Sequence, residues 1–204
     1  MIKILAAAMG MNFWVVCEAQ EKREFYSNGA LKGVGPVSGL DKVGQWHYYY
    51  PNGKKSAVEN YNQGLLDGEI LYFYPTEIIQ ARETWELGSL TDSAWYYHPS
   101  GRLDRKGMYR KSEYTGTWIH FFENGNPERE VHYENGLPQG ETKVFNEAGT
   151  LIQQGFYQEG LEDGEWKFYT ATGELEYVGS YRKGNPVGIW YHYRKGKKKI
   201  YQRY

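Results

Sequence analysis

Histidine is the side chain most often used for acid–base chemistry and for zinc, and this 204-residue chain contains five. A zinc ion is held by ligands at about 2 Å, so its histidines must meet in the fold. The histidines are spread along the chain over several copies of the repeated unit described below, and we expect no metal site. The five are His47, His98, His120, His132 and His192.

Paired carboxylates are the other arrangement that could catalyse proton transfer. Glu128 with Glu130, and Glu174 with Glu176, stand two residues apart and would share one face of a strand, a pattern typical of a solvated surface. No serine lies in a G-x-S-x-G motif. We therefore expect a protein that is not an enzyme and that uses no cofactor.

Residues 33–39 contain three glycines and superficially resemble a phosphate-binding loop. Pro36 interrupts them, and no helical pattern follows whose N-terminus could bind phosphate. We expect an irregular loop at one end of the molecule.

The first 19 residues differ in character from the rest. Lys3 precedes an apolar run from Ile4 to Val16, and Cys17 and Ala19 are followed by a polar segment. This pattern is typical of a secretory signal peptide cleaved after Ala19, because the run is shorter than the roughly 20 residues that span a bilayer. A retained anchor and a lipid on Cys17 are the alternatives. Export predicts a periplasmic, outer-membrane-associated or extracellular bacterial protein.

The elements that must position all these residues are copies of a unit that returns every 24 residues. Aromatic residues occupy every position reached by steps of 24 between Phe25 and Tyr193, which predicts an array of similar supersecondary units. This structural ladder consists of Phe25, Tyr49, Phe73, Tyr97, Phe121, Phe145, Tyr169 and Tyr193. A second aromatic column starts at Tyr61, and a glycine column that starts at Gly44 is broken only by Asp92.

Each unit consists of two strand-like runs and two turns. The run from Gln45 to Tyr50 is followed by Pro-Asn-Gly, and Asn-Gly favours a two-residue hairpin turn in which both residues have positive φ. No window shows the 3.6-residue period of a helix. We therefore expect an all-β fold, an elongated single-layer antiparallel meander of about eight 24-residue β-hairpin repeats. At 4.8 Å per strand it would be about 75 Å long.

The repeat divides the chain into four segments. Residues 1–19 are the expected signal peptide, and residues 20–43 a degenerate N-terminal repeat or cap. Six repeats follow over residues 44–188, and residues 189–204 form a truncated C-terminal repeat with a basic cap. The third unit is the most degraded, with Glu77 at a glycine position, and the last is one residue short.

The pattern G-x-W-x-Y-Y-Y-P-N-G, with a following aromatic residue and a G-x-x-x-G link, resembles the MORN repeat. It is most similar to the bacterial variant found in YwqK-type antitoxin-like repeat proteins, and the resemblance covers roughly residues 24–204. It implies a β-repeat scaffold that serves protein and membrane contacts alike. One unit matches at Gly44, Trp46, Tyr49, Asn52, Gly53, Tyr61 and Gly64, and another at Gly164, Trp166, Tyr169, Gly173, Tyr181 and Gly184.

Strand alternation places Trp46 and Tyr48 on one face and Tyr49 on the other. We expect the ladder to act as the core, since large aromatic side chains bury much area. The columns of Trp46 and Tyr48 vary between units, and they either line a half-buried groove or form an exposed binding strip. The candidate partner-binding residues there are Trp46, Tyr48, Trp118, His120, Trp166, Phe168 and Trp190. Which face carries the Tyr61 column depends on the hairpin register.

The C-terminal segment has six basic residues and no acidic one. Lys197, Lys198 and Lys199 are candidate binding residues, which either protect an edge strand from aggregation or dock on an anionic partner or lipid surface.

We expect a non-catalytic scaffold for protein–protein interaction, antitoxin- or immunity-like, in the cell envelope or exterior. Its partner would be a protein such as a toxin or an envelope protein. The alternative is association with a membrane surface through the basic cap. No nucleic-acid partner is expected.

Overall fold

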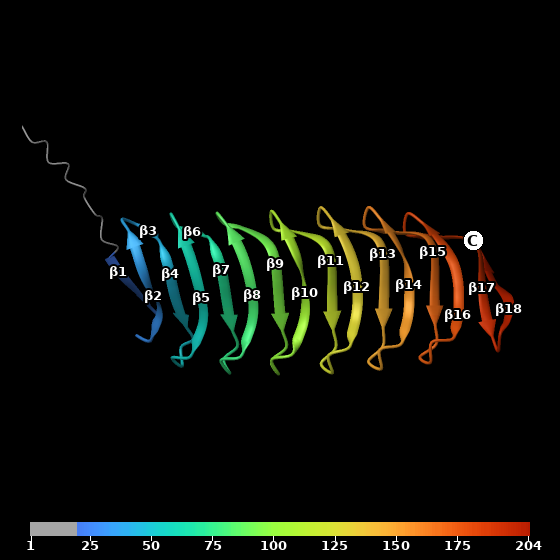
Figure 1. The fold of residues 1–204 in the computed structure, drawn as a ribbon, viewed down its shortest axis with the longest axis horizontal. Coiled ribbons are helices and arrows are strands. Elements are labelled where there is room, and N and C mark those ends of the chain that lie inside the picture. Colours follow the sequence, from blue (N-terminus) through green and yellow to red (C-terminus); the bar gives the residue numbers. More distant parts are fainter. Residues whose placement is uncertain (1–19) are drawn as a thin grey trace, which may run out of the picture.

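The computed structural model describes residues 20–204 as one open antiparallel sheet, in which successive strands pair along the chain except at β3/β4 and β6/β7 (Figure 1). The expected signal peptide, residues 1–19, lies outside the described residues. The strands are β1 (Gln20–Phe25), β2 (Leu31–Ser38), β3 (Asp41–Lys42), β4 (Gly44–Tyr49), β5 (Lys55–Asn62), β6 (Leu65–Leu66), β7 (Gly68–Phe73), β8 (Ile79–Glu86), β9 (Ser89–Tyr97), β10 (Leu103–Arg110), β11 (Glu113–Phe121), β12 (Pro127–Glu134), β13 (Leu137–Phe145), β14 (Leu151–Gln158), β15 (Leu161–Tyr169), β16 (Leu175–Arg182), β17 (Asn185–Arg194) and β18 (Lys197–Arg203).

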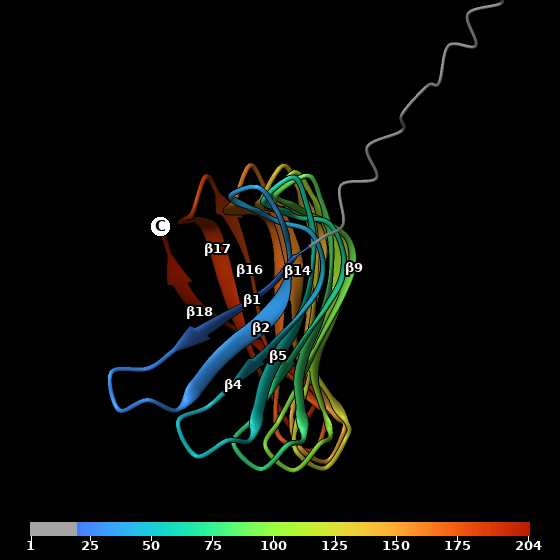
Figure 2. The ribbon, with the colours of Figure 1, turned by 90° about the vertical axis from the view of Figure 1, so that its left-hand side faces the viewer.

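The expected all-β meander is confirmed. β3 and β4 form one strand interrupted at Val43, and β6 and β7 one interrupted at Asp67. With each pair counted once, the sheet has sixteen strands, two for each of eight units. Residues 20–204 contain no helix, and so none long and apolar enough to cross a membrane. Seen along the long axis, the strands are bowed and rotate gradually from β1 to β18 (Figure 2), as the twist of β-sheets requires.

Along one side of the sheet, where the strand ends lie, the hairpins close through five-residue turns of the same hydrogen-bond pattern. The Tyr50 N–H donates to the Lys54 carbonyl (2.7 Å), and the Gly53 N–H donates to the Tyr50 carbonyl (2.9 Å). Only Gly53 has positive φ, so the expected two-residue Asn-Gly turn is wrong. Asn52 contributes its side chain instead, because its Oδ1 accepts a hydrogen bond from the Lys54 N–H (3.1 Å).

Two-residue turns with positive φ at both residues occur along the opposite side, where the sequence offers fewer asparagines. Gln63 (φ 49°) and Gly64 (φ 81°) form one of them. The others are at residues 87–88, 111–112, 135–136, 159–160 and 183–184. A further two-residue turn, at residues 195–196, lies on the side of the five-residue turns and replaces one of them, because the final unit is one residue short.

Positions that break the repeat in sequence keep it in backbone conformation. Glu77 replaces the turn glycine and still has φ 67°. Asp92 replaces glycine in the Gly44 column and has φ 55°, a region that aspartate tolerates better than most residues. Neighbouring hairpins therefore impose the turn geometry on the degraded third unit.

The core lies on the face of Trp46, which we call the tryptophan face. Trp46, Trp118 and Trp166 are 0–1% exposed and Trp190 is 7% exposed, whereas Phe25 in the ladder is 58% exposed and Tyr49 is half-buried on the other face. The expectation that the ladder is the core is therefore wrong.

The strand register also shows which face of the sheet carries the Tyr61 column. Gly44 pairs with Tyr61 and Trp46 with Glu59, so the Tyr61 column belongs to the tryptophan face.

A glycine on the preceding strand makes room for each buried indole. A Cβ built on Gly155 would overlap the ring of Trp166, 11 residues later. The same relation joins Gly35 to Trp46, Gly107 to Trp118 and Gly179 to Trp190. Where the earlier residue is larger, the later one is not tryptophan: the pairs are Glu59 with Ile70, Glu83 with Ala94, and Val131 with Thr142. The two columns thus compensate each other in volume.

Residues 33–39 are not the irregular loop expected from their glycines. Residues 31–38 form β2, in which Gly35 accommodates the Trp46 ring and Gly33 lies under the ring of Tyr48. Gly33 and Gly35 therefore serve close packing, and Gly39 has the positive φ of a turn.

Candidate functional site

Three units after the first lack tryptophan in this column, at Ile70, Ala94 and Thr142. In two of them the residue opposite, Glu59 or Glu83, takes part in a polar network. Glu83, only 9% exposed, accepts hydrogen bonds from the Tyr96 hydroxyl (2.8 Å) and the Trp85 Nε1–H (3.0 Å). The Tyr96 and Tyr109 hydroxyls are 3.1 Å apart. Burial raises the pKa of Tyr109 to about 12 and, with the hydrogen bonds to Tyr109 and Glu83, raises the pKa of Tyr96. Both phenols therefore stay protonated at neutral pH and can donate.

A similar network surrounds Glu59, the residue opposite Ile70, on the strands of the second unit. The Tyr61 hydroxyl donates to Glu59 and lies 3.2 Å from the Tyr48 hydroxyl. The Lys42 ammonium donates to the Tyr48 hydroxyl (2.6 Å) and pairs with Glu24 (3.1 Å). These side chains satisfy one another, so the network stabilises this end of the sheet.

The third such unit, that of Val131 and Thr142, remains open. A hollow of about 560 Å³ lies on the tryptophan face there, within the size range of small-ligand sites. Thr142 itself is 3% exposed, and its hydroxyl donates to the Glu130 carbonyl (3.0 Å). We call this site the hollow; it is lined by Glu128, Arg129, Val131, Tyr133, Pro138, Thr142, Val144, Gln153, Tyr157, Gly160 and Glu162.

Two tyrosines form the aromatic walls of the hollow. Tyr133 packs edge-on against Tyr114 (ring centroids 5.1 Å apart), and Tyr114 in turn packs on Trp118 (4.2 Å). On the other side Tyr157 packs edge-on against Trp166 (5.3 Å). Burial raises the pKa of both Tyr133 and Tyr157. The hollow therefore separates two rigid aromatic clusters.

Charged groups surround these walls. Glu128, Arg129 and Glu162 take part in none of the ion pairs found within residues 20–204. Beside the hollow, His120 pairs across the strands with Arg129 and Arg105. Burial, and then these two cations, lower the pKa of His120, so its imidazole is neutral at pH 7. The hollow thus combines aromatic walls with uncompensated charges.

The residues predicted to bind a partner are distributed differently from the expectation. Trp46, Trp118, Trp166 and Trp190 are buried in the core, so they do not form an exposed strip. Tyr48, His120 and Phe168 are half-buried on the same face, with Phe168 stacked on Trp166 (6.3 Å). The structure agrees with the half-buried groove, the other alternative, and partner binding by these positions stays a prediction.

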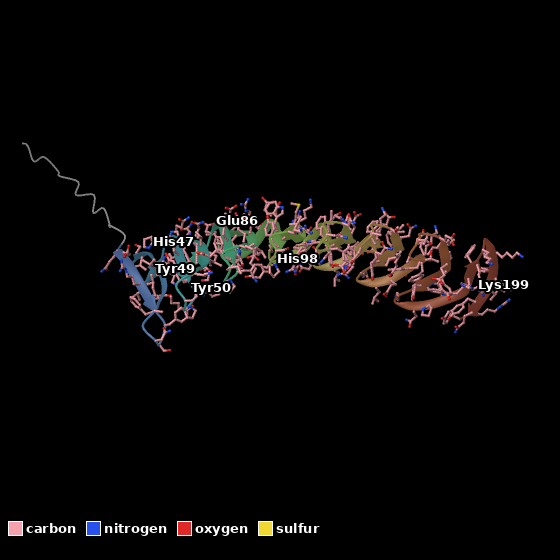
Figure 3. The ribbon with its side chains drawn as sticks, turned by 90° about the horizontal axis from the view of Figure 1, so that it is seen from below. His47, Tyr49, Tyr50, Glu86, His98 and Lys199 are labelled. Carbon is pink, nitrogen blue, oxygen red and sulfur yellow. The ribbon has the colours of Figure 1, made fainter. Side chains whose placement is uncertain are left out.

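The basic cap lies at the end of the rod opposite His47 and Tyr49, where Lys199 is labelled (Figure 3). The cap consists of Arg194, Lys195, Lys197, Lys198, Lys199 and Arg203, all exposed. None of them takes part in an ion pair within the described part of the chain. A hollow of about 330 Å³ there is lined only by His192, Arg194, Lys195, Lys197 and Lys199.

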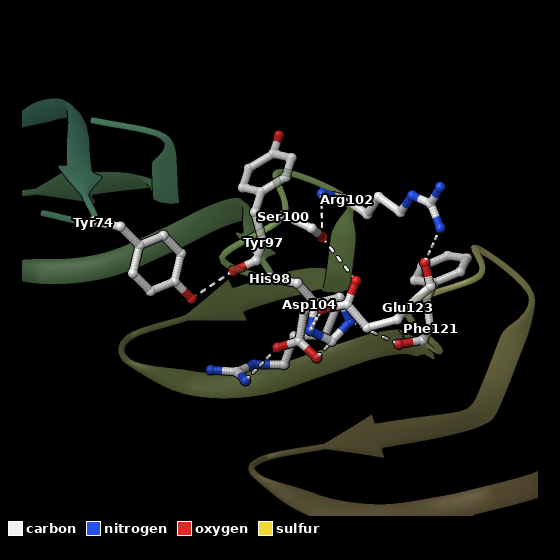
Figure 4. Close-up of polar contacts among 9 residues, drawn as sticks. Tyr74, Tyr97, His98, Ser100, Arg102, Asp104, Phe121 and Glu123 are labelled. Atoms are coloured by element: carbon white, nitrogen blue, oxygen red, sulfur yellow. Dashed lines mark hydrogen bonds and ion pairs between the residues drawn. The ribbon is translucent and has the colours of Figure 1, made fainter. Parts of the chain in front are cut away.

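Sequence reasoning missed a polar cluster at the five-residue turns (Figure 4). His98 lies 3.7 Å from both Asp104 and Glu123, and the Ser100 hydroxyl donates to Glu123 (2.8 Å). Activation of a serine requires contact with the imidazole, whereas here the carboxylate separates them. The His98 ring also lies 3.2 Å from the Phe121 carbonyl.

The position of His98 explains this contact. In the preceding units Tyr26, Tyr50 and Tyr74 donate to carbonyls 23 residues later, with the Tyr74 hydroxyl 2.8 Å from the Tyr97 carbonyl. His98 occupies the same place one unit on, so its contact with Phe121 joins neighbouring hairpins. The signal in the sequence is the aromatic column of Tyr26 continued at His98.

Comparison with known proteins identifies the repeat. The family model described as "MORN repeat variant" matches at residues 42–63, 114–135, 138–159 and 162–183, which confirms the resemblance to MORN repeats. The match does not extend to the YwqK-type antitoxin-like proteins in particular. No curated protein matches the chain.

Similar solved structures include complexes named TcdB2-TccC3-Cdc42, TcdB2-TccC3 and TcdB2-TccC3-TEV. They share 11%, 11% and 13% sequence identity with this chain at a TM-score of 0.23 each. The matches cover 88% of this chain but only 13%, 14% and 10% of those chains. At this level of similarity nothing follows for partners or activity.

Proposed function

We propose that this chain, which carries four MORN repeat variants, is a non-catalytic scaffold that binds a protein partner at the hollow of its tryptophan face. MORN repeats are commonly protein-interaction and scaffold modules. The observation that carries the proposal is the open unit at Val131 and Thr142, a preformed concave site on the tryptophan face between two aromatic clusters. Such a site binds without the entropic cost of ordering a loop.

The place of action that we propose is the cell envelope or exterior. The apolar run of residues 4–16 after Lys3 supports export. In that compartment an immunity-like role fits better than a cytosolic antitoxin, and the partner would be a toxin or an envelope protein.

Capture of the partner tests this function. The tagged full chain is expressed in the cells that make it, and both the envelope and the cytosol are extracted at low and at high salt. We expect one envelope protein to be retained at high salt, because contacts in the hollow are partly apolar and resist screening. Retention of no protein from either fraction would refute the scaffold.

A second candidate function is supported by the basic cap. The 330 Å³ hollow lined by His192 and four cations would suit an anionic lipid headgroup or phosphate. Peripheral association with an envelope or membrane surface would then occur at the end of the rod, far from the hollow of the tryptophan face.

Vesicle sedimentation tests the second candidate. If it holds, binding to anionic vesicles falls steeply with salt and is lost in Lys197→Glu/Lys198→Glu/Lys199→Glu, while neutral vesicles do not bind. Free phosphate competes with the vesicles only if the cavity in the basic cap recognises the phosphate group alone. Equal binding of neutral and anionic vesicles would eliminate this candidate.

A further inference from the structure

We infer that the hollow accepts an aromatic side chain of the partner that stands next to a lysine or arginine in an exposed segment. This inference rests on the proposed scaffold function and names the chemistry of its partner. Its basis is a gap in the aromatic packing of the chain and the charges that surround that gap.

The gap is visible in the ring contacts. Tyr96, Tyr109, Tyr114 and Tyr133 form one cluster around Trp118. The second cluster runs from Tyr157 through Trp166, Phe168, Tyr181 and Trp190 to Tyr204. On the tryptophan face no ring of the described chain lies between Tyr133 and Tyr157, because Thr142 stands where the flanking units have tryptophan. An aromatic side chain from outside would lie between the two walls and contact both.

The neighbouring units also show why the chain leaves this place empty. Trp118 and Trp166 lie over Gly107 and Gly155, whereas Val131 occupies the equivalent glycine position in the open unit. Its side chain raises the floor, so the inserted ring would rest higher than the native indoles, between the tyrosines and within reach of the surface.

Charge selects what stands beside the inserted ring. Two carboxylates, Glu128 and Glu162, and one guanidinium, Arg129, line the hollow without an ion-pair partner in the described chain. The excess of negative charge favours a cation beside the ring. The Arg129 guanidinium can donate hydrogen bonds to a backbone carbonyl of the same segment.

The second unit supplies an internal precedent for this chemistry. There the Lys42 ammonium lies 4.3 Å from the Trp46 ring centroid and 5.5 Å from that of Tyr61, with Glu24 at 3.1 Å. Tyr157 is the counterpart of Tyr61, four repeats later. The tryptophan face thus already holds a cation against aromatic rings and a carboxylate.

A filled variant removes the hollow with residues that the repeat already uses. Val131→Gly with Thr142→Trp reproduces the glycine–tryptophan pairs of the flanking units. Because it completes the packing, we expect this variant to melt at or above the temperature of the wild type. A second variant, Glu162→Lys, reverses one charge, and Glu147→Lys in an exposed turn is its matched control.

The probe is the capped peptide Ala-Lys-Trp-Lys-Ala, titrated by NMR against the full chain. A fragment of this size should bind with a dissociation constant on the order of 1 mM. We expect binding to fall at least about tenfold in the filled variant and about fivefold in Glu162→Lys, and to be unchanged in Glu147→Lys. Peptides with alanine in place of tryptophan, or glutamate in place of both lysines, should not bind.

Two results would overturn the inference. One is equal binding of the peptide by the wild type and by the filled variant or, should that variant not fold, by Glu162→Lys. The other is equal binding of the lysine and glutamate peptides. Either result leaves the scaffold function intact if the wild type still captures an envelope protein, whereas failure of that capture removes the scaffold itself.

Discussion

Replacing Gly155 by valine would place a branched side chain inside the ring of Trp166, since even a Cβ at this position overlaps the indole. Overpacking of this kind costs about 1–3 kcal/mol of unfolding free energy. Replacing Trp166 by threonine instead leaves a cavity in the core, because this residue is 1% exposed. Loss of a buried tryptophan costs about 3–5 kcal/mol.

The double change Gly155→Val/Trp166→Thr recreates the natural pair of Val131 and Thr142. The valine no longer meets a ring, and its methyl groups fill part of the space that the indole leaves. We therefore expect the double variant to lose about 2 kcal/mol less unfolding free energy than the sum of the two single losses. This coupling is within the range seen for directly contacting residues.

Urea denaturation followed by circular dichroism measures all four chains. The matched control combines Gly107→Val with Trp166→Thr, two residues that belong to different glycine–tryptophan pairs. Their effects should add within about 0.3–0.5 kcal/mol. Equal coupling in the control and in the Gly155/Trp166 pair, or no coupling in either, would refute volume compensation between the two columns.

Three further predictions follow from the fold. Phe121→Ala should lower the melting temperature less than Trp118→Ala, because Phe121 is half-buried and Trp118 is 1% exposed. A larger effect at Phe121 would show that the aromatic ladder, and not the tryptophan face, forms the core. Burial raises the pKa of Tyr109 from about 10 in the unfolded chain to about 12 in the folded chain. The unfolding free energy that this difference contributes is complete below about pH 10 and is lost as the pH rises to about 12. An unfolding free energy that does not change between about pH 10 and about pH 12 would contradict the buried network around Glu83. Glu77→Gly should stabilise the chain by about 1 kcal/mol, since φ at this position is 67°, and a lower melting temperature would show that the turn is not strained.

The 24-residue period was sufficient to predict the meander, its two strands per unit and the degraded third repeat. A period shows which residues are equivalent, but not which face is buried, and so the Tyr49 ladder was assigned the role that belongs to Trp46 and its equivalents. The sequence leaves open whether the interruptions of that column at Ile70, Ala94 and Thr142 belong to a half-buried groove or to an exposed binding strip. They follow a packing constraint from the neighbouring strand, and partner binding there stays a prediction.

That constraint is present in the sequence, in the correlation between each tryptophan and a glycine 11 residues earlier, as in Gly155 and Trp166. Comparison of one column at a time does not reveal it. The cluster of His98, Ser100 and Glu123 cannot be predicted from one unit for a related reason. Glu123 lies about one period after His98 and Ser100, so the residues meet only when adjacent hairpins lie side by side in the sheet.

The most direct test of the account is the amount of envelope protein retained at high salt by three immobilised chains and quantified by mass spectrometry. The chains are the wild type, the filled variant Val131→Gly/Thr142→Trp and the basic-cap variant Lys197→Glu/Lys198→Glu/Lys199→Glu. We predict that the wild type and the cap variant retain the same protein and that the filled variant loses it. Equal retention by the filled variant would contradict binding at the hollow.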